Sequence, residues 1–188
     1  MDYYIDIRLL PDPEFPAAML MGALFSKLHR ALVDLRATDL GVSFPEHRNG
    51  HKKSLGQVLR LHGSAAALDH LMATGWLKGM RDHISASDMA EVPADTRYLV
   101  VCRRQFKTSA ERLRRRRARR HGETLEQARE HIPDSVERKV DLPFATIRSL
   151  STRQTFHLFV EHGDIRQDPV AGRFNAYGLS DEATVPWF

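Results

Sequence analysis

A run of arginines is the densest concentration of chemically distinctive residues in the chain. Seven of the nine residues from Arg112 to Arg120 are Arg, and only Ala110, Leu113 and Ala118 nearby are apolar. At roughly 100° per residue, such a run surrounds a helix and leaves too few apolar positions for a core-facing stripe. Arg makes bidentate contacts with phosphate and guanine and stacks on bases. The run therefore favours a nucleic-acid partner over a solvated helix face, which would usually mix Glu and Lys.

The charge of the chain is distributed very unevenly. Residues 103–121 hold ten of the 28 Lys and Arg residues and one of the 24 acidic residues, which gives this segment a net charge of +9. The rest of the chain keeps 18 basic and 23 acidic residues, a net charge of −5. Like charges four residues apart, such as Arg112 and Arg116, destabilise an isolated helix. The pattern indicates a polyanion as partner, because an anion would offset this repulsion.

The sequence alone leaves the kind of nucleic acid open. A basic helix can enter the major groove of DNA, whereas the A-form groove is normally too deep and narrow, except near a hairpin end or loop. Arg103 and Gln105 alternate on the strand expected before the helix, so both side chains point the same way. They could contact base edges at one end of a duplex, or they could simply lie on a solvent-exposed strand face.

Candidates for chemistry outside the arginine run are fewer. His29 lies one turn beyond Phe25 on the first expected helix, and histidine suits proton transfer because it titrates near neutral pH. The more ordinary interpretation is a surface or boundary histidine. Phe156 could stack on a base or belong to the core, and Tyr177 in FNAYG is first interpreted as strand packing. The hydroxyls Ser149, Ser151 and Thr152 cluster at an expected hairpin turn, where such groups usually bond to turn backbone.

Several functional classes are disfavoured. With Cys102 as its single cysteine, the chain has no intramolecular disulfide and no four-cysteine zinc site. GHKKS lacks the upstream glycine of a phosphate-binding loop, and no G-x-S-x-G motif occurs. His47 and His51 are four apart in an expected loop without further ligands, so no metal site is predicted. No signal peptide or long apolar run appears, and the expected location is the cytoplasm.

Hydrophobic periodicity predicts an α+β fold with a βαββαβ unit at its start. Strand 2–9 alternates, helix 16–35 has apolar residues at helical spacing, and Ser64 should cap the second helix. The remaining expected elements of this unit are strands 40–45 and 55–62, helix 65–74 and a weak strand near 87–93. This order is typical of a ferredoxin-like (RRM-like) domain, which we place at residues 1–95.

Residues 96–188 are predicted to form a second α+β domain. A strand at 98–106 leads into the arginine helix, which should start at Ser109 or Ala110 after the capping box Thr108–Glu111 and stop at Gly122. A second capping box, Thr124–Gln127, should open a short helix that ends at Pro133. Strands are expected at 144–149 and 154–161 as a hairpin, and as a further pair at 164–168 and 172–179.

The chain closely resembles the CRISPR repeat-processing endoribonucleases of the subtype I-F systems, nearly end to end. The resemblance is carried by the opening DIRLLPDPEFP, by FSKLH ending at His29, and by VSFP, ERLRRR, the following RRH, IPD, DLPF, the RS-x-ST turn, YGLS and VPWF. It implies a ferredoxin-like N-terminal domain and a C-terminal domain that places the arginine helix in the major groove of the repeat hairpin.

The resemblance also implies cleavage at the 3′ base of the hairpin without a metal or other cofactor. The ribose 2′-hydroxyl attacks the adjacent phosphate, which leaves a 2′,3′-cyclic phosphate and a 5′-hydroxyl. His29 matches the catalytic histidine, Ser149 the serine that positions the 2′-hydroxyl, and Tyr177 a tyrosine at the active site. A nucleophile built into the substrate needs only alignment and a proton acceptor, so the chemistry is consistent with this expectation.

The remaining matches concern RNA binding. Ser151 and Thr152 match the turn that holds the RNA near the cut, and Phe156 matches the aromatic residue stacked on the terminal base pair. Arg103 and Gln105 match the base readers. The groove contacts match Arg115, Arg116, Arg119 and Arg120, and Arg112 and His121 of the same segment are also RNA-binding candidates.

The sequence departs from the family pattern at some points. Arg117 stands where an apolar residue is expected, and residues 46–54 and 164–173 do not match. The glycine-rich loop of the wider repeat-processing family is absent, with only Gly172 and Gly178 nearby. Subtype I-F members also lack that loop, so its absence favours the narrower group.

Three functions remain to be compared. A site-specific endoribonuclease is favoured by His29 together with Ser149. The alternatives are a non-catalytic RNA-hairpin-binding subunit of a ribonucleoprotein and, against the resemblance, a DNA-binding regulator. The expected partners are the CRISPR repeat hairpin, as precursor and as product guide RNA, and other subunits of the subtype I-F surveillance complex.

Overall fold

The computed structural model describes residues 1–106, 109–136, 140–148 and 154–188. The chain divides into two compact units by its internal contacts. The larger comprises Met1–Arg104 together with Leu142–Phe188, and the smaller comprises Gln105–Asp141. The sequence analysis placed a boundary between two folding domains near residue 95. Units defined by internal contacts do not test that boundary, so it stays a prediction.

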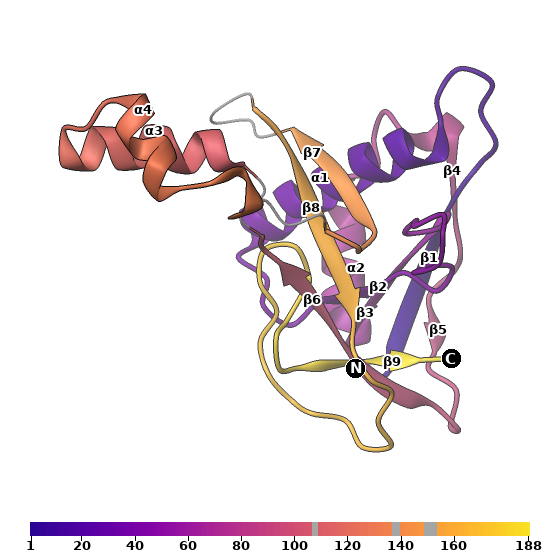
Figure 1. The fold of residues 1–188 in the computed structure, drawn as a ribbon. Helices are drawn as coiled ribbons and strands as arrows, with labels where there is room; N and C mark the ends of the chain where they lie inside the picture. Colours follow the sequence, from indigo (N-terminus) through magenta and orange to yellow (C-terminus); the bar gives the residue numbers. More distant parts are fainter. Residues whose placement is uncertain (107–108, 137–139, 149–153) are drawn as a thin grey trace. The chain divides into compact units, whose positions relative to one another are not determined.

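The first sheet of the larger unit has the predicted βαββαβ order (Figure 1). Its elements are β1 (Tyr3–Leu9), α1 (Ala17–Leu35), β2 (Gly41–Ser43), β3 (Val58–Gly63), α2 (Ala65–Ala73), β4 (Ile84–Ala86) and β5 (Ala90–Glu91), with a 3-10 turn at Arg81–His83. The strands are antiparallel in the order β2-β3-β1-β4, and β5 also pairs with β1. The weak strand expected near 87–93 corresponds to the two-residue strand β5, and β4 lies just before the expected range. The order of the strands is that of a ferredoxin-like sheet.

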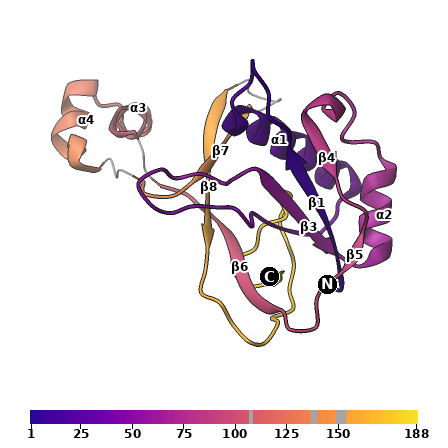
Figure 2. The same ribbon diagram turned by 90° about the vertical axis from the view of Figure 1, so that its right-hand side faces the viewer.

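Local sequence explains where the two helices begin and end. Pro16 precedes α1, and Arg36 closes it in the left-handed conformation at φ 51°. Ser64 caps α2 as predicted, since its hydroxyl accepts a hydrogen bond from the Ala67 amide at 3.2 Å. Both helices pack against β1 and contact each other (Figure 2). This arrangement fixes α1, which carries His29, on one face of the first sheet.

The second sheet contains β6 (Arg97–Arg104), β7 (Phe144–Arg148), β8 (Thr155–His162) and β9 (Thr184–Trp187). These strands are antiparallel in the order β7-β8-β6-β9, so the predicted hairpin of β7 and β8 is confirmed. The strand predicted at 98–106 ends at Arg104, one residue before Gln105. Gln105 therefore lies just outside the strand, and the expectation that its side chain points the same way as that of Arg103 stays a prediction.

The strand pair predicted at 164–168 and 172–179 is wrong. Between Gly163 and Ala183 the only ladder contact of the described residues is an isolated bridge between Tyr98 and Arg166. Residues 175–178 form a turn instead, because the Asn175 side chain bonds backbone amides ahead of it. The ladder partner of β6 at this edge is β9, formed by the terminal VPWF segment.

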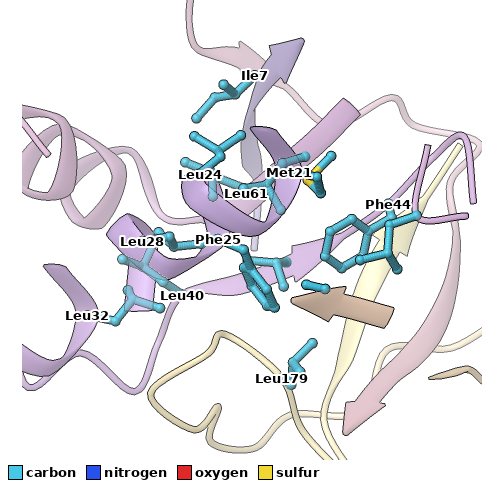
Figure 3. Packing of buried hydrophobic residues seen from close by; sticks show 14 of the residues in the cluster. Ile7, Met21, Leu24, Phe25, Leu28, Leu32, Leu40, Phe44, Leu61 and Leu179 are labelled. Carbon is cyan, nitrogen blue, oxygen red and sulfur yellow. The ribbon is translucent and has the colours of Figure 1, made fainter. Parts of the chain in front are cut away.

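The two sheets of the larger unit share one hydrophobic core. Leu24, Phe25 and Leu28 of α1 are fully buried, and the same cluster includes residues of both sheets, among them Leu61 and Leu158. Figure 3 shows the α1 side chains together with Phe44, Leu61 and Leu179. Because α1 packs against both β1 and β7, it connects the first sheet to the second.

The smaller unit contains α3 (Ala110–His121), α4 (Leu125–His131) and a 3-10 turn at Asp134–Val136. Ser109 caps α3 by accepting a hydrogen bond from the Arg112 amide, whereas Thr108 of the predicted capping box lies outside the described residues. Gly122 closes α3 at φ 67°, and both bonds of the Thr124–Gln127 capping box are present. The predicted start and end of the arginine helix are therefore confirmed. No helix in the described parts of the chain is long and apolar enough to cross a membrane.

Candidate active site and nucleic-acid interface

A hydrogen bond to a backbone carbonyl orients the His29 ring. The half-buried imidazole has its Nδ1 2.7 Å from the carbonyl oxygen of Ala176. A carbonyl can only accept, so Nδ1 carries the proton of this bond. In the neutral ring the other nitrogen, Nε2, then has a free lone pair. His29 is thus prepared to accept a proton at a defined atom.

The turn that carries Ala176 is held by its own residues. The Asn175 Oδ1 atom accepts hydrogen bonds from the amides of Tyr177 at 2.8 Å and Leu179 at 3.3 Å. Gly178 adopts φ +69°, and its carbonyl accepts a bond from the Val42 amide at 2.9 Å. These contacts fix the turn to β2, so the carbonyl that orients His29 has a defined position. Tyr177 is consequently a turn residue, and the interpretation as strand packing is wrong.

Aromatic and basic side chains surround the His29 ring. Tyr177 stacks on it with ring centres 4.0 Å apart and an interplanar angle of 8°. Burial raises the pKa of the Tyr177 phenol, against a smaller opposing effect of Arg103, so the phenol stays neutral near pH 7. The Arg103 guanidinium lies 5.6 Å from the Tyr177 ring centre and 5.8 Å from that of Phe156. The structure therefore brings together four candidates that are distant in sequence, namely His29, Arg103, Phe156 and Tyr177.

A hollow of about 330 Å³ opens beside this cluster. Its lining comes from α1, from the end of β7 and from two of the aromatic residues, namely Ala23, Ser26, Lys27, His29, Arg30, Ile147, Arg148, Phe156 and Tyr177. None of these lining residues is acidic, and a single histidine with cationic neighbours is a poor donor set for a metal ion. Elsewhere in the described residues, no three His, Cys, Asp or Glu side chains form such a set.

Three candidates fall in the segment that follows the hollow along the chain. Ser149 comes directly after Arg148, and Ser151 and Thr152 follow it. All three lie outside the described residues. Their roles stay predictions that rest on the sequence.

Two arginines of α3 face the smaller unit rather than solvent. Arg114 is buried, with its Nε donating to the Ile132 carbonyl at 2.8 Å and its Nη2 2.7 Å from Asp134. Arg117 makes a bidentate pair with Glu123 at 2.8 and 3.0 Å. Two of the seven arginines that surround the helix are therefore paired with groups of the protein itself. The pair also explains how α3 accommodates Arg117 where an apolar residue was expected.

The remaining arginines form one exposed face of α3. Their spacing of three, four, seven and eight residues places them on the same side of the helix. They are Arg112, Arg115, Arg116, Arg119 and Arg120. Within the described residues only Arg115 has a carboxylate partner, Glu111. His121 and Gln105 are also exposed. We call this set of five arginines the arginine face.

Sequence reasoning did not identify several residues of the hollow. Lys27, Arg30 and Arg148 border it, and Asn175 holds the turn beside it. Their positions in the sequence could have indicated these basic residues, since Lys27 and Arg30 lie beside the candidate His29. Arg148 likewise directly precedes the candidate Ser149. What was missing was the approach of α1 to β7, which brings these positions together.

Comparison with known proteins identifies the family. The model of the family described as CRISPR-associated protein (Cas_Csy4) matches residues 4–188. The CRISPR-associated endonuclease Cas6/Csy4 of Pseudomonas aeruginosa (strain UCBPP-PA14) is 51% identical over 188 residues, which is the full length of both chains. The protein of the same description from Escherichia coli (strain UTI89 / UPEC) is 47% identical, also over the full length of both. The chain therefore belongs to the Cas_Csy4 family of CRISPR-associated proteins.

Proposed function

We propose that this chain is an endoribonuclease that binds the hairpin of CRISPR repeat RNA and cuts at its 3′ base. The names of the two relatives, both CRISPR-associated endonucleases, support nuclease activity. The observation that carries the proposal furthest is the bond from His29 Nδ1 to the Ala176 carbonyl, because it leaves Nε2 as a proton acceptor beside the hollow.

The proposed reaction uses a nucleophile that the RNA itself supplies. The 2′-hydroxyl gives its proton to a base and forms a bond to the adjacent phosphorus, and the bond from phosphorus to the 5′-oxygen breaks. The departing oxygen takes up a proton, so the products carry a 2′,3′-cyclic phosphate and a 5′-hydroxyl. His29 is the proposed group for proton transfer. Alignment of an internal nucleophile can lower the barrier by several kcal/mol, so no metal ion is required in principle.

The other site residues have proposed roles in alignment. Tyr177, stacked on the imidazole, keeps the His29 ring in its plane. Ser149 orients the 2′-hydroxyl, and Ser151 and Thr152 hold the RNA near the cut. Phe156 lies half-buried at the hollow, where it can stack on the terminal base pair of the hairpin.

RNA binding is assigned to exposed polar and basic side chains. The arginine face, with His121, contacts phosphates and base edges in the groove of the hairpin. Arg103 and Gln105 read base edges at the end of the duplex. We propose as further partners the guide RNA product and other subunits of a subtype I-F surveillance complex. The proposal also includes a cytoplasmic location and two folding domains divided near residue 95.

Incubation with repeat hairpin RNA in excess EDTA tests this function. We expect a single cut at the 3′ base of the hairpin, with a cyclic phosphate on one product and a 5′-hydroxyl on the other. Loss of cutting in chelator with recovery in Mg²⁺ would refute the metal-independent reaction. Tight binding without any cut, with or without metal, would instead support a non-catalytic RNA-binding subunit.

A further inference from the structure

Three basic side chains border the hollow beside His29. Lys27 and Arg30 lie on α1, and Arg148 lies at the end of β7. None of the three forms an ion pair with a carboxylate of the described residues. Other arginines of the larger unit are neutralised in this way, in the pairs Arg8–Glu46, Arg60–Asp6 and Arg104–Glu161. The hollow therefore concentrates uncompensated positive charge, and its lining has no acidic residue to offset it.

The shape of the hollow follows from small residues on α1. Ala23, Ser26 and Arg30 are spaced three, four and seven residues apart, so they share one face of the helix. The two small side chains leave open space, with Arg30 at its end on α1 and Arg148 contributed by β7. An anion in this space would have guanidinium groups from two different elements within reach.

Lys27 is held in place at the same rim. Its ammonium donates a hydrogen bond to the Lys78 carbonyl at 2.7 Å. An ammonium has three donor hydrogens, so two remain for a bound anion. Because the position of the nitrogen is already fixed, little side-chain freedom is lost when an anion binds.

The proposed reaction creates a need for positive charge at this point. When the 2′-oxygen bonds to phosphorus, negative charge grows on the non-bridging oxygens of the phosphate. Metal-dependent nucleases offset this charge with divalent ions, whereas a reaction without metal needs fixed cationic side chains. Donors positioned where this charge develops stabilise the transition state without having to reorganise during the reaction.

We propose that Arg30 and Arg148, assisted by Lys27, form a phosphate clamp that binds the non-bridging oxygens of the phosphodiester being cut. The clamp rests on the proposed endoribonuclease function and adds to it the groups that stabilise the transition state. No proton leaves the guanidinium groups, since arginine stays charged at all relevant pH values. The clamp is distinct from the arginine face, which lies on α3 in the smaller unit.

Substitution by glutamine tests the clamp. Arg30→Gln, Arg148→Gln and the double variant are compared with Arg173→Gln, which removes an exposed arginine that does not line the hollow. Single-turnover cleavage is measured at saturating protein, and binding is measured with a hairpin that has a 2′-deoxyribose just before the cut. We expect cleavage to slow by about 100-fold in the double variant, with binding within about threefold of wild type. Arg173→Gln should cut at the wild-type rate.

Two further readouts separate a clamp from a structural role. Arg30→Lys and Arg148→Lys should restore part of the rate, because a cation returns. Replacing one non-bridging oxygen of the cut phosphate with sulfur should slow the wild type more than the double glutamine variant. Wild-type cleavage rates in the double variant, or equal losses of binding and cleavage, would refute the clamp while the cutting function stands. If the wild type cuts only with added Mg²⁺, the proposed function itself fails.

Discussion

Gly22 of α1 lies directly against the backbone of Thr146 in β7. A Cβ atom at position 22 would come within 2.5 Å of the Thr146 carbonyl oxygen, a distance that real Cβ atoms essentially never show. The missing side chain is therefore what lets α1 and β7 approach so closely. His29 lies two turns further along α1, and Arg148 lies two residues further along β7, so this contact sets the width of the hollow between them.

Gly22→Ala should destabilise the protein even though it places a good helix former in a helix. The intrinsic gain of alanine over glycine is about 1 kcal/mol. Overpacking against backbone costs roughly 1–3 kcal/mol, and a carbonyl oxygen cannot rotate away as a flexible side chain can. We therefore expect a lower free energy of unfolding in urea titrations. Gly50→Ala is the control, since a Cβ there meets nothing within 4 Å. Equal or higher stability of Gly22→Ala would mean that β7 shifts freely.

His29→Ala should separate chemistry from binding. One neutral contact is worth about 1 kcal/mol, so hairpin affinity should stay within about tenfold of wild type. Single-turnover cleavage should slow by at least about 100-fold, the typical loss for a general acid or base. A hairpin with 2′-deoxyribose just before the cut should bind normally and resist cleavage. Near wild-type cutting by the variant would make His29 a structural residue, and normal cutting of the deoxy substrate would mean that water is the nucleophile.

Substitutions on the arginine face should weaken binding according to each side chain's position on α3. Arg116→Ala or Arg120→Ala should reduce hairpin affinity by about 1–3 kcal/mol for each well-made contact. The combined change Arg117→Met and Glu123→Met is the control, because it removes a paired charge from the other side of the helix without altering net charge. Fluorescence anisotropy at several salt concentrations provides both affinities and the salt dependence. Wild-type affinity should fall steeply with salt, and an affinity independent of salt would contradict an electrostatic grip.

Acid should weaken the larger unit through His162. Burial, with a smaller effect of His47, lowers the pKa of this imidazole from 6.5 to about 3. Its Nε2 accepts a bond from the Phe44 amide at 3.3 Å, and its ring stacks on His47 at 3.7 Å. The unfolded chain takes up a proton below pH 6.5 that the folded chain excludes, so stability falls as the pH drops. Protonation of this group in the unfolded chain lowers the free energy of unfolding by up to about 1.4 kcal/mol for each unit that the pH drops.

Chemical denaturation between pH 7 and pH 5 measures this effect. His162→Gln keeps an acceptor for the Phe44 amide but does not titrate, so the slope of stability against pH should be shallower in this variant. Some slope remains, because burial also lowers the pKa of His47. An unchanged slope would show that His162 is protonated in the folded protein.

Local sequence signals predicted much of the fold because they act over a few residues. The capping hydroxyls of Ser64 and Thr124 and the stop at Gly122 placed helix ends within about one residue of where they lie. The alternation of Tyr3–Leu9 and the hairpin of Phe144–Arg148 with Thr155–His162 were equally local. These features need no knowledge of tertiary contacts.

Errors arose where a distant partner decides the outcome. Burial of Arg114 depends on its contacts with Ile132 and Asp134. These two residues follow α4 and reach Arg114 only because the chain turns back after Gly122. The aromatic and apolar residues of 172–179 were interpreted as a strand, yet the bonds of Asn175 close a turn there. The hollow was missed because it depends on Gly22 meeting Thr146, a contact across more than a hundred residues.

The ion pairs of α3 have a consequence for the timing of RNA capture. Glu111, Glu123 and Asp134 each compensate one arginine before any RNA is present. The sequence had suggested that α3 needs a polyanion to offset the repulsion between its arginines. These ion pairs offset part of that repulsion, so the helix can form before RNA binds. A preformed helix loses little conformational entropy on docking, so the encounter is limited by diffusion and charge steering rather than by folding. Association with the hairpin is accordingly expected to be fast, to accelerate at low ionic strength, and to show no lag from helix formation.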